Sequence, residues 1–273
     1  MKTVVLPGGR EVPALGMGTW KMGEDSRRRA AEIAALQRGI DLGMTLIDSA
    51  EMYGEGGAEE VVGESLKGRR ERVFIVSKVY PHNATRRGTI AACERSLKRL
   101  GIETIDLYLL HWRGSVPLAE TFDAFAELQR SGKINSFGVS NFDTSDMEEA
   151  WGIPAGQKIA SNQILYNLTR RSVEHDLLPW CSRHRVPVMA YSPVERGRLV
   201  RDRKLLNRDA TPAQIALAWL LTMEGIIAIP KSSDVRHVEE NRVAADLVLT
   251  AEELSLIDRA FPRPRERKPL EML

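Results

Sequence analysis

The chain has 273 residues. At about 150 residues per domain this length predicts one to two domains, but it also fits a single α/β barrel of about 250 residues. The 39 lysines and arginines nearly balance the 37 aspartates and glutamates, so the formal net charge is +2, which argues against a nucleic-acid-binding protein. The longest apolar run, residues 215–221, is far shorter than the ~20 residues of a membrane-spanning helix. Cys93 and Cys181 lie far apart in the sequence and form no Cys-x-x-Cys pair, so we expect free thiols in a protein of a reducing compartment. We read no export signal and expect a cytoplasmic monomer with one domain over residues 1–273 and no membrane or nucleic-acid partner.

The first thirteen residues predict a β-hairpin, because Pro7-Gly8-Gly9 separates two short apolar runs and glycine tolerates turn conformations. Eight further apolar runs follow, and stretches with helical periodicity separate them. These runs are residues 15–18, 46–48, 73–77, 105–110, 134–139, 159–164, 186–190 and 226–229. Their continuous apolar character is typical of parallel strands that are covered by helices.

Helical periodicity is clear over residues 27–42, 89–100, 118–129 and 212–223. We expect the first of these helices to bury a face formed by Ala30, Ile33, Ala34 and Gln37. A last helix over residues 251–260 follows Thr250 as N-cap, with Glu253 in the capping-box position. The alternation predicts an α/β fold, a (β/α)8 TIM barrel with an N-terminal β-hairpin closing the bottom and an extra C-terminal helix.

Titratable side chains stand at the ends of three consecutive strands of this predicted barrel. The second, third and fourth strands end at Asp48, Lys78 and His111, and Tyr53 follows in the loop after Asp48. Active sites of such barrels form at the carboxyl ends of the strands, so these four side chains are expected to meet there. A buried ion pair or a hydrogen-bonded strand end is the structural alternative for each residue taken alone.

Together the four side chains could deliver a proton to an oxygen atom. A phenol has an ordinary pKa of about 10, but a nearby ammonium such as Lys78 lowers that pKa, and Asp48 would anchor the ammonium. His111 can orient a carbonyl oxygen by donating a hydrogen bond. Since the group contains no electron source, a hydride has to come from a cofactor. Lys78 would also suit a Schiff-base aldolase, which remains an alternative.

Two segments have residue types that are typical of phosphate-binding loops. Residues 54–59 are rich in glycine, but Glu59 replaces the third glycine of the Rossmann pattern and would repel a pyrophosphate, so we predict a loop and a helix start. Lys231-Ser232-Ser233-Asp234 follows the eighth strand and offers an ammonium, two hydroxyls and a helix N-terminus. We predict a phosphate site there, with a simple helix cap as the alternative.

Eight motifs in order along the chain resemble the aldo-keto reductase family. They are Gly-x-Gly-Thr-Trp (16–20), Leu-Ile-Asp-Ser-Ala-Glu-Met-Tyr-Gly (46–54), Ser-Lys-Val (77–79), Asp-Leu-Tyr-Leu-Leu-His-Trp (106–112), Gly-Val-Ser-Asn-Phe (138–142), Asn-Gln (162–163), Ala-Tyr-Ser-Pro (190–193) and Ile-Pro-Lys-Ser-Ser (229–233). The resemblance implies an NADPH-dependent oxidoreductase that reduces aldehydes and ketones to alcohols. It implies a catalytic tetrad of Asp48, Tyr53, Lys78 and His111, with Tyr53 as general acid.

The resemblance also implies the cofactor contacts. Ser140, Asn141 and Gln163 would hold the nicotinamide carboxamide, Tyr191 would stack on the ring, and Asp48 would touch the ribose. The 2′-phosphate would bind to Lys231 and Ser232, and Glu240 and Asn241 would contact adenine. The other cofactor contacts expected are Gly18, Thr19, Trp20, Ser192 and His237.

One position departs from the family pattern. Many members carry an arginine six residues after the lysine of the phosphate site, and this chain has His237 there. Imidazole lacks the permanent charge of a guanidinium, so the preference for NADPH over NADH is expected to be weaker than in members with arginine. NADH remains a possible cofactor, and no metal is expected.

The substrate pocket is expected to consist of Trp20, Val79, Tyr80 and Trp112. Short loops around these residues predict an open pocket for small aldehydes, and the chain resembles bacterial members that reduce methylglyoxal and aromatic aldehydes. A non-catalytic subunit that senses nicotinamide cofactors is a further alternative.

Overall fold

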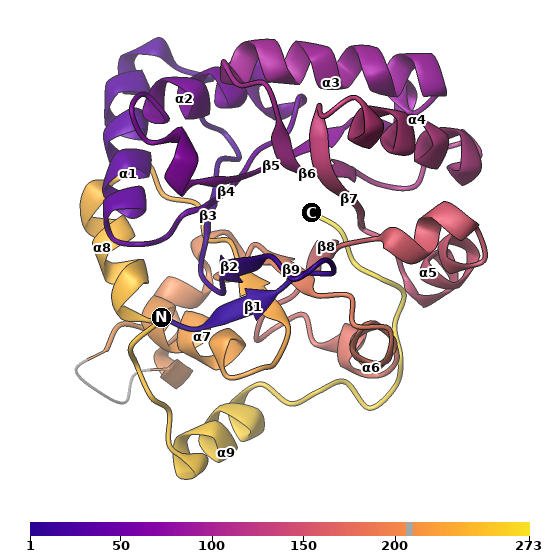
Figure 1. The fold of residues 1–273 in the computed structure, drawn as a ribbon. Helices are drawn as coiled ribbons and strands as arrows, with labels where there is room; N and C mark the ends of the chain where they lie inside the picture. The colour runs from indigo at the N-terminus through magenta and orange to yellow at the C-terminus, as the bar shows by residue number, and fades with distance from the viewer. Residues whose placement is uncertain (206–209) are drawn as a thin grey trace.

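The computed structural model describes residues 1–205 and 210–273, and its centre is a parallel eight-stranded sheet with the strand order β10-β9-β8-β7-β6-β5-β4-β3 (Figure 1). The strands are β3 (Met17–Gly18), β4 (Leu46–Asp48), β5 (Phe74–Val79), β6 (Ile105–Leu110), β7 (Ile134–Ser140), β8 (Asn162–Leu165), β9 (Val188–Tyr191) and β10 (Ile226–Ala228). Parallel bridges from Leu15 to Ala228 and from Gly18 to Lys231 join the first strand to the last, so the sheet closes into a barrel.

Helices surround this barrel on its outside (Figure 1). They are α1 (Arg29–Asp41), α2 (Gly57–Ser65), α3 (Arg86–Leu100), α4 (Leu118–Arg130), α5 (Thr144–Trp151), α6 (Leu177–Arg183), α7 (Pro212–Leu221), α8 (Val235–Val243) and α9 (Ala251–Ala260). The predicted (β/α)8 barrel with an extra C-terminal helix is confirmed. The capping box predicted for the last helix is also present, with the side chain of Thr250 accepting a hydrogen bond from the backbone of Glu253.

The closure of the barrel depends on a glycine at the seam between β3 and β10. The backbone N–H of Gly18 donates to the carbonyl of Pro230 at 3.0 Å. A Cβ atom on Gly18 would lie 2.9 Å from the carbonyl oxygen of Ile229, which is closer than real Cβ contacts come. The seam can therefore form this tightly because residue 18 carries no side chain.

The face that α1 buries differs from the one expected. The helix buries Glu32, Ala35, Leu36, Gly39 and Ile40, whereas Ala30 and Ala34 of the expected face are exposed. The larger side chains of Leu36 and Ile40 decide the orientation, because they bury more apolar area than the alanines. Gly39 then allows Met17 to approach the helix closely.

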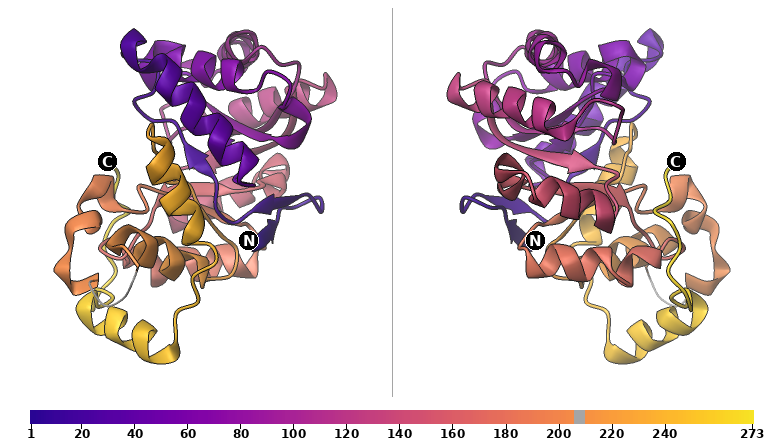
Figure 2. Two further views of the ribbon diagram at one scale, coloured as in Figure 1. Left: turned by 90° about the vertical axis from the view of Figure 1, so that its left-hand side faces the viewer. Right: turned by 90° about the vertical axis from the view of Figure 1, so that its right-hand side faces the viewer.

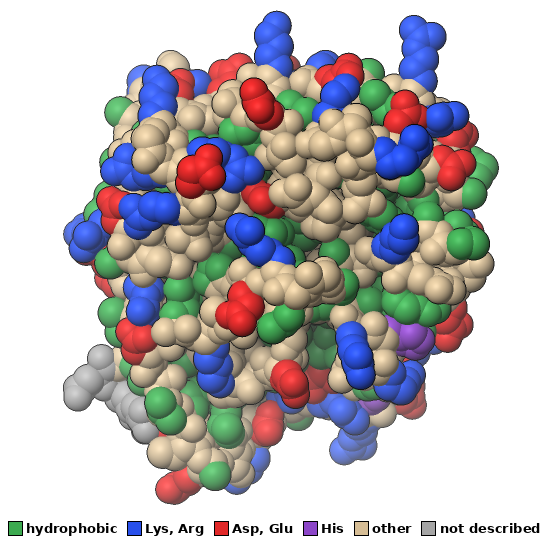
Figure 3. Space-filling view, in the orientation of Figure 1, with side chains coloured by type: hydrophobic (Ala, Val, Ile, Leu, Met, Phe, Trp, Pro, Cys, Tyr) green, Lys and Arg blue, Asp and Glu red, His purple; other side chains and the backbone are tan. Residues whose placement is uncertain are grey.

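The predicted hairpin consists of β1 (Thr3–Val5) and β2 (Glu11–Pro13), with Val4 and Val12 turned toward the core. It covers the end of the barrel at which the strands begin, while the C-terminus lies at the opposite end (Figure 2). On the face that carries the hairpin, acidic and basic side chains are interspersed (Figure 3). Within the described ranges, no helix is long and apolar enough to cross a membrane.

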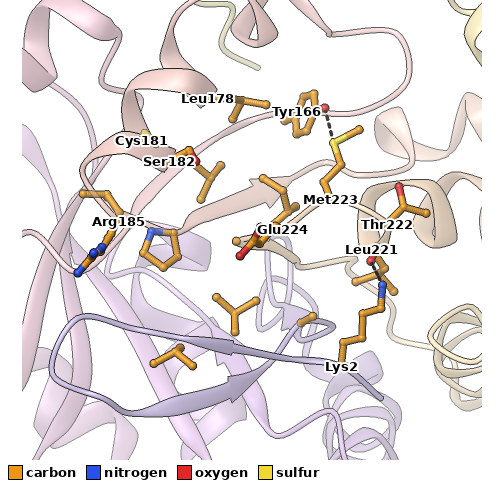
Figure 4. Close-up of a pocket in the computed structure, with 18 of the residues that line it drawn as sticks. Lys2, Tyr166, Leu178, Cys181, Ser182, Arg185, Leu221, Thr222, Met223 and Glu224 are labelled. Atoms are coloured by element: carbon orange, nitrogen blue, oxygen red, sulfur yellow. Dashed lines mark hydrogen bonds between the residues drawn. The ribbon is translucent and has the colours of Figure 1, made fainter.

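A cavity of about 930 Å³ lies at this hairpin end, between β1 and the starts of β9 and β10 (Figure 4). The hydroxyl of Tyr166 donates to the sulfur of Met223 at its wall, and Lys2 donates to the carbonyl of Leu221. Because the cavity adjoins the beginnings of the strands, it is separate from the carboxyl ends, where Asp48, Lys78 and His111 are found.

Candidate active site

A buried ion pair lies at the bottom of the site. Lys78 of β5 and Asp48 at the end of β4 lie on neighbouring strands, and their side chains are 0% and 4% exposed. The Lys78 ammonium donates to Asp48 at 2.8 Å, to the backbone carbonyl of Ser49 at 2.8 Å and to the hydroxyl of Tyr53 at 3.3 Å. An ammonium has three protons to donate, so the three acceptors hold it fully.

Tyr53 reaches this ion pair because the chain turns sharply after β4. Gly54 and Glu55 both have a φ above 50°, and the backbone N–H of Tyr53 donates to the carbonyl of Ala50 at 3.1 Å. The Tyr53 oxygen accepts the hydrogen bond from Lys78, so its own O–H proton is left to be donated elsewhere. Asp48, Lys78 and Tyr53 thus lie together at the carboxyl ends of the strands, as the sequence predicted.

The pKa of Tyr53 differs from the expectation. Removal of water from around the hydroxyl raises this pKa well above the ordinary 10.0, and the charge of Asp48 raises it further. The expected lowering of this pKa by Lys78 is therefore wrong, because burial of the hydroxyl and, after it, the carboxylate of Asp48 oppose the effect of the ammonium. Tyr53 consequently keeps its proton throughout the neutral pH range.

His111 follows β6 and faces Tyr53, with the two rings edge to face and their centroids 5.7 Å apart. Burial lowers the pKa of His111 well below the ordinary 6.5, and the charge of Lys78 lowers it further. The imidazole is therefore neutral at pH 7. Its Nδ1 atom is buried without a hydrogen-bond partner among the described residues. The neutral ring carries a single proton. When this proton is on Nε2, Nδ1 is unprotonated, and Nε2 is the atom that can donate a hydrogen bond.

The amide side chains expected to hold a nicotinamide are connected to the ion pair. The side chain of Gln163 on β8 donates to Asp48 at 2.7 Å, and the Ser140 hydroxyl donates to the backbone carbonyl of Gln163 at 2.9 Å. Asn141 donates to the backbone of His111 at 3.0 Å and accepts from the Tyr191 hydroxyl at 2.9 Å. One hydrogen-bonded network thus joins the expected catalytic residues to the expected cofactor residues.

Aromatic side chains surround this network. Trp20 is 38% exposed, and the guanidinium of Arg196 lies over its ring at 4.6 Å from the ring centre. Tyr80 packs edge to face against Trp112, with centroids 4.9 Å apart, and Trp112 packs in turn against His111. These contacts leave Trp20, Tyr80 and Trp112 at the carboxyl end of the barrel.

Val79 does not belong with these aromatic residues, contrary to the expectation. It is 0% exposed. Side chains alternate across a strand, and Ser77, two residues earlier, contacts Glu59 of the outer helix α2. Val79 therefore faces the helices rather than a substrate.

Glu59 itself is buried in α2, which begins at Gly57. Its carboxylate accepts from Ser77 at 2.5 Å and from Arg99 at 2.6 Å. The prediction that residues 54–59 form a loop and a helix start is confirmed.

The expected phosphate site follows β10 and leads into α8. Lys231 donates to the Ser233 hydroxyl at 3.0 Å, and Ser232 accepts from the backbone N–H of Asp234 at 3.1 Å. Burial lowers the pKa of Lys231, as do the charges of Arg28 and Lys21. The residues expected beside adenine, which are His237, Glu240 and Asn241, lie within α8.

Sequence reasoning missed two residues. Arg28 donates to the hydroxyl of Ser233 at 2.9 Å although 205 positions separate them. Arg196, which has a φ of 51°, meets Trp20 from the loop after β9. No periodicity or motif marks these arginines, because only the closure of the barrel brings their loops together.

The donor set fits a nicotinamide dinucleotide phosphate. At one end are the amides of Asn141 and Gln163 with the hydroxyl of Ser140, beside the proton donor Tyr53. At the other end Lys231 and Arg28 have no ion-pair partner among the residues that the structure describes. An uncharged amide group and an anion are the ligands that these two ends can take.

Comparison with known proteins gives consistent matches. The model of the aldo/keto reductase family matches residues 14–210 and 203–261. Methylglyoxal reductase YeaE of Escherichia coli is 47% identical over 100% of this chain and 99% of its own length. Glyoxal reductase of Bacillus subtilis is 33% identical over 97% of this chain and 96% of its own length. An aldo-keto reductase of Klebsiella pneumoniae, solved in complex with NADPH, superposes with a TM-score of 0.95 at 47% identity, covering 100% and 99% of the two chains.

Replacing Asp48 with asparagine should destabilise the protein, because the buried ammonium of Lys78 then lacks its counter-charge. We expect the free energy of unfolding to fall by about 3 kcal/mol, measured by urea denaturation at pH 7. The double variant Asp48→Asn/Lys78→Met should recover most of this loss, since it leaves no unpaired buried charge. Equal stability of the two variants would contradict a structural role for the ion pair.

Proposed function

The chain belongs to the aldo/keto reductase family, and we propose that it reduces small 2-oxoaldehydes such as methylglyoxal with NADPH, using Tyr53 as proton donor. The contact between the Lys78 ammonium and the Tyr53 oxygen carries this proposal. It leaves the phenol proton free for a substrate and holds a cation where negative charge develops when that proton leaves. This arrangement suits proton transfer to a carbonyl oxygen.

Each member of the tetrad has a separate task. Tyr53 donates its proton to the carbonyl oxygen, and His111 donates a hydrogen bond from Nε2 to the same oxygen. Lys78 stabilises the phenolate that remains on Tyr53, and Asp48 keeps the ammonium in position. NADPH supplies, when bound, the hydride that the carbonyl carbon takes up.

The cofactor residues divide into two groups. Ser140, Asn141 and Gln163 would hold the carboxamide, Tyr191 would stack on the nicotinamide ring, and Asp48 would contact the ribose. Lys231 and Ser232 would hold the 2′-phosphate. The remaining contacts proposed are those of Gly18, Thr19, Trp20, Ser192, His237, Glu240 and Asn241.

The proposed substrates follow from the relatives and from the side chains around Tyr53. Two of the relatives are reductases of methylglyoxal and of glyoxal. Trp20, Tyr80 and Trp112 offer flat apolar surfaces near the tetrad, which suit small aldehydes and aromatic aldehydes. We therefore propose that both classes are reduced.

The burial of Lys78 argues against the aldolase alternative. A Schiff-base lysine has to lose a proton and reach a substrate carbonyl. Lys78 is 0% exposed and donates to three oxygens, so its amine is neither free nor accessible. The hydrogen bonds among Asp48, Lys78 and Tyr53, with the His111 ring beside Tyr53, likewise favour catalysis over a purely cofactor-sensing role.

We also propose that residues 1–273 act as one domain and as a cytoplasmic monomer. A continuous hydrophobic core supports the single domain, and the two free, buried cysteines suit a reducing compartment. Light scattering coupled to size-exclusion chromatography should give a mass near 30.5 kDa. A dimer mass would contradict the monomer.

Removal of the Tyr53 hydroxyl in Tyr53→Phe should lower kcat for methylglyoxal reduction by about a hundredfold to ten-thousandfold, the range of general acid catalysis. NADPH affinity, measured by quenching of tryptophan fluorescence, should stay within about twofold of the wild type. Tyr166→Phe makes the same chemical change at the hairpin end and should leave kcat unchanged. Near-wild-type activity of Tyr53→Phe would show that another group is the acid.

The pH dependence should differ between the two directions of the reaction. The pKa of Tyr53 is raised above 10.0 and that of His111 is lowered below 6.5, so the phenol is protonated and the imidazole neutral between these values. The kcat for reduction, measured at saturating NADPH, should therefore be flat across this interval. Alcohol oxidation needs the phenolate and should accelerate as the pH rises. A reduction rate that falls through neutral pH would contradict this assignment.

A further inference from the structure

Two cations meet at the seam of the barrel. Arg28 ends the short 3-10 helix η1 (Ser26–Arg28), which precedes α1, and Lys231 follows β10. Both donate to the same atom, the Oγ of Ser233, at 2.9 Å and 3.0 Å. A guanidinium and an ammonium that share one hydroxyl lie close enough to contact a single phosphate group together.

Neither Arg28 nor Lys231 forms an ion pair within the part of the chain that the structure describes. Burial lowers the pKa of Lys231, and the charge of Arg28 lowers it further. The neighbouring Arg27 is exposed, as Arg28 is, but it is paired with Asp25 at 3.0 Å. The carboxylates of Glu24 and Glu32 act on Lys231 in the opposite sense to Arg28, and Arg28 acts on Asp25, so the two cations are partly compensated without being paired. A dianion between Arg28 and Lys231 would reduce their mutual repulsion further.

We propose that Arg28 is a second cationic ligand of the 2′-phosphate of NADPH and a determinant of the preference for NADPH over NADH. This inference rests on the proposed function, which assigns the phosphate to Lys231 and Ser232. Arg28 supplies from α1's side of the seam the permanent charge that His237 on α8 lacks. The guanidinium can also donate two parallel hydrogen bonds to a phosphate, which an imidazole cannot do.

The test measures cofactor binding by the complete protein, without turnover. In Arg28→Gln we expect the Kd of NADPH, measured by isothermal titration calorimetry, to rise about 10–100-fold, the worth of a hydrogen bond to a charged group. The Kd of NADH should stay within about twofold, because NADH has no 2′-phosphate. Adenosine 2′,5′-bisphosphate should lose affinity as NADPH does, whereas adenosine 5′-diphosphate should not.

Arg27→Gln is the matched control, since it removes the same charge one residue away from a side chain already paired with Asp25. It should leave both affinities within about twofold of the wild type. Arg28→Lys should retain part of the NADPH affinity, because it keeps the charge but loses the paired hydrogen bonds.

Three outcomes would overturn the inference. In the first, Arg28→Gln weakens NADPH and NADH equally, which indicates damage to the fold or to the common part of the site. In the second, it weakens neither while the wild type prefers NADPH, so that the proposed function stands and the role of Arg28 fails. In the third, the wild type binds NADPH and NADH equally, so that the proposed cofactor preference fails as well.

Discussion

The buried ion pair between Lys78 and Asp48 determines how the rest of the site is arranged. A charged ammonium without exposed surface requires a counter-charge and hydrogen-bond acceptors, and Asp48, Ser49 and Tyr53 provide them. Asp48 also accepts from Gln163, which extends the same network to β8. The need to compensate the buried charge of Lys78 therefore holds the proton donor Tyr53, the carboxylate of Asp48 and the amide of Gln163 in one arrangement.

The barrel makes this network possible because its parallel strands bring residues that are distant in sequence to the same end. Asp48 and Gln163 are 115 positions apart, and their side chains meet at 2.7 Å in the interior of the barrel. Loops and turns then aim the remaining groups. The left-handed residues Gly54 and Glu55 direct the chain after Tyr53, and Asn141, with a φ of 57°, turns the chain after β7.

Much of this site could be predicted from the sequence, because strand ends and residue types are local properties. The positions of Asp48, Lys78 and His111 at consecutive strand ends are sufficient to predict that they meet. The pKa of Tyr53 could not be predicted in this way, since its direction depends on burial and on the balance between Lys78 and Asp48. The burial of Val79 required the register of β5, and the orientation of α1 required the relative sizes of its apolar side chains. The contact between Arg28 and Ser233 depends on closure of the whole barrel, which no local pattern encodes.

The seam between β3 and β10 has a consequence for how the protein is held together. Its two sides belong to the first and the last strands, and Arg28 and Lys231 face each other across it. A nucleotide phosphate bound by both would act as a removable cross-link between the two ends of the chain's fold. A ligand that binds the folded, closed barrel but not the unfolded chain shifts the folding equilibrium toward the closed barrel. The cofactor would then add to the stability of a barrel that the backbone hydrogen bonds of the seam already close, in addition to supplying the hydride.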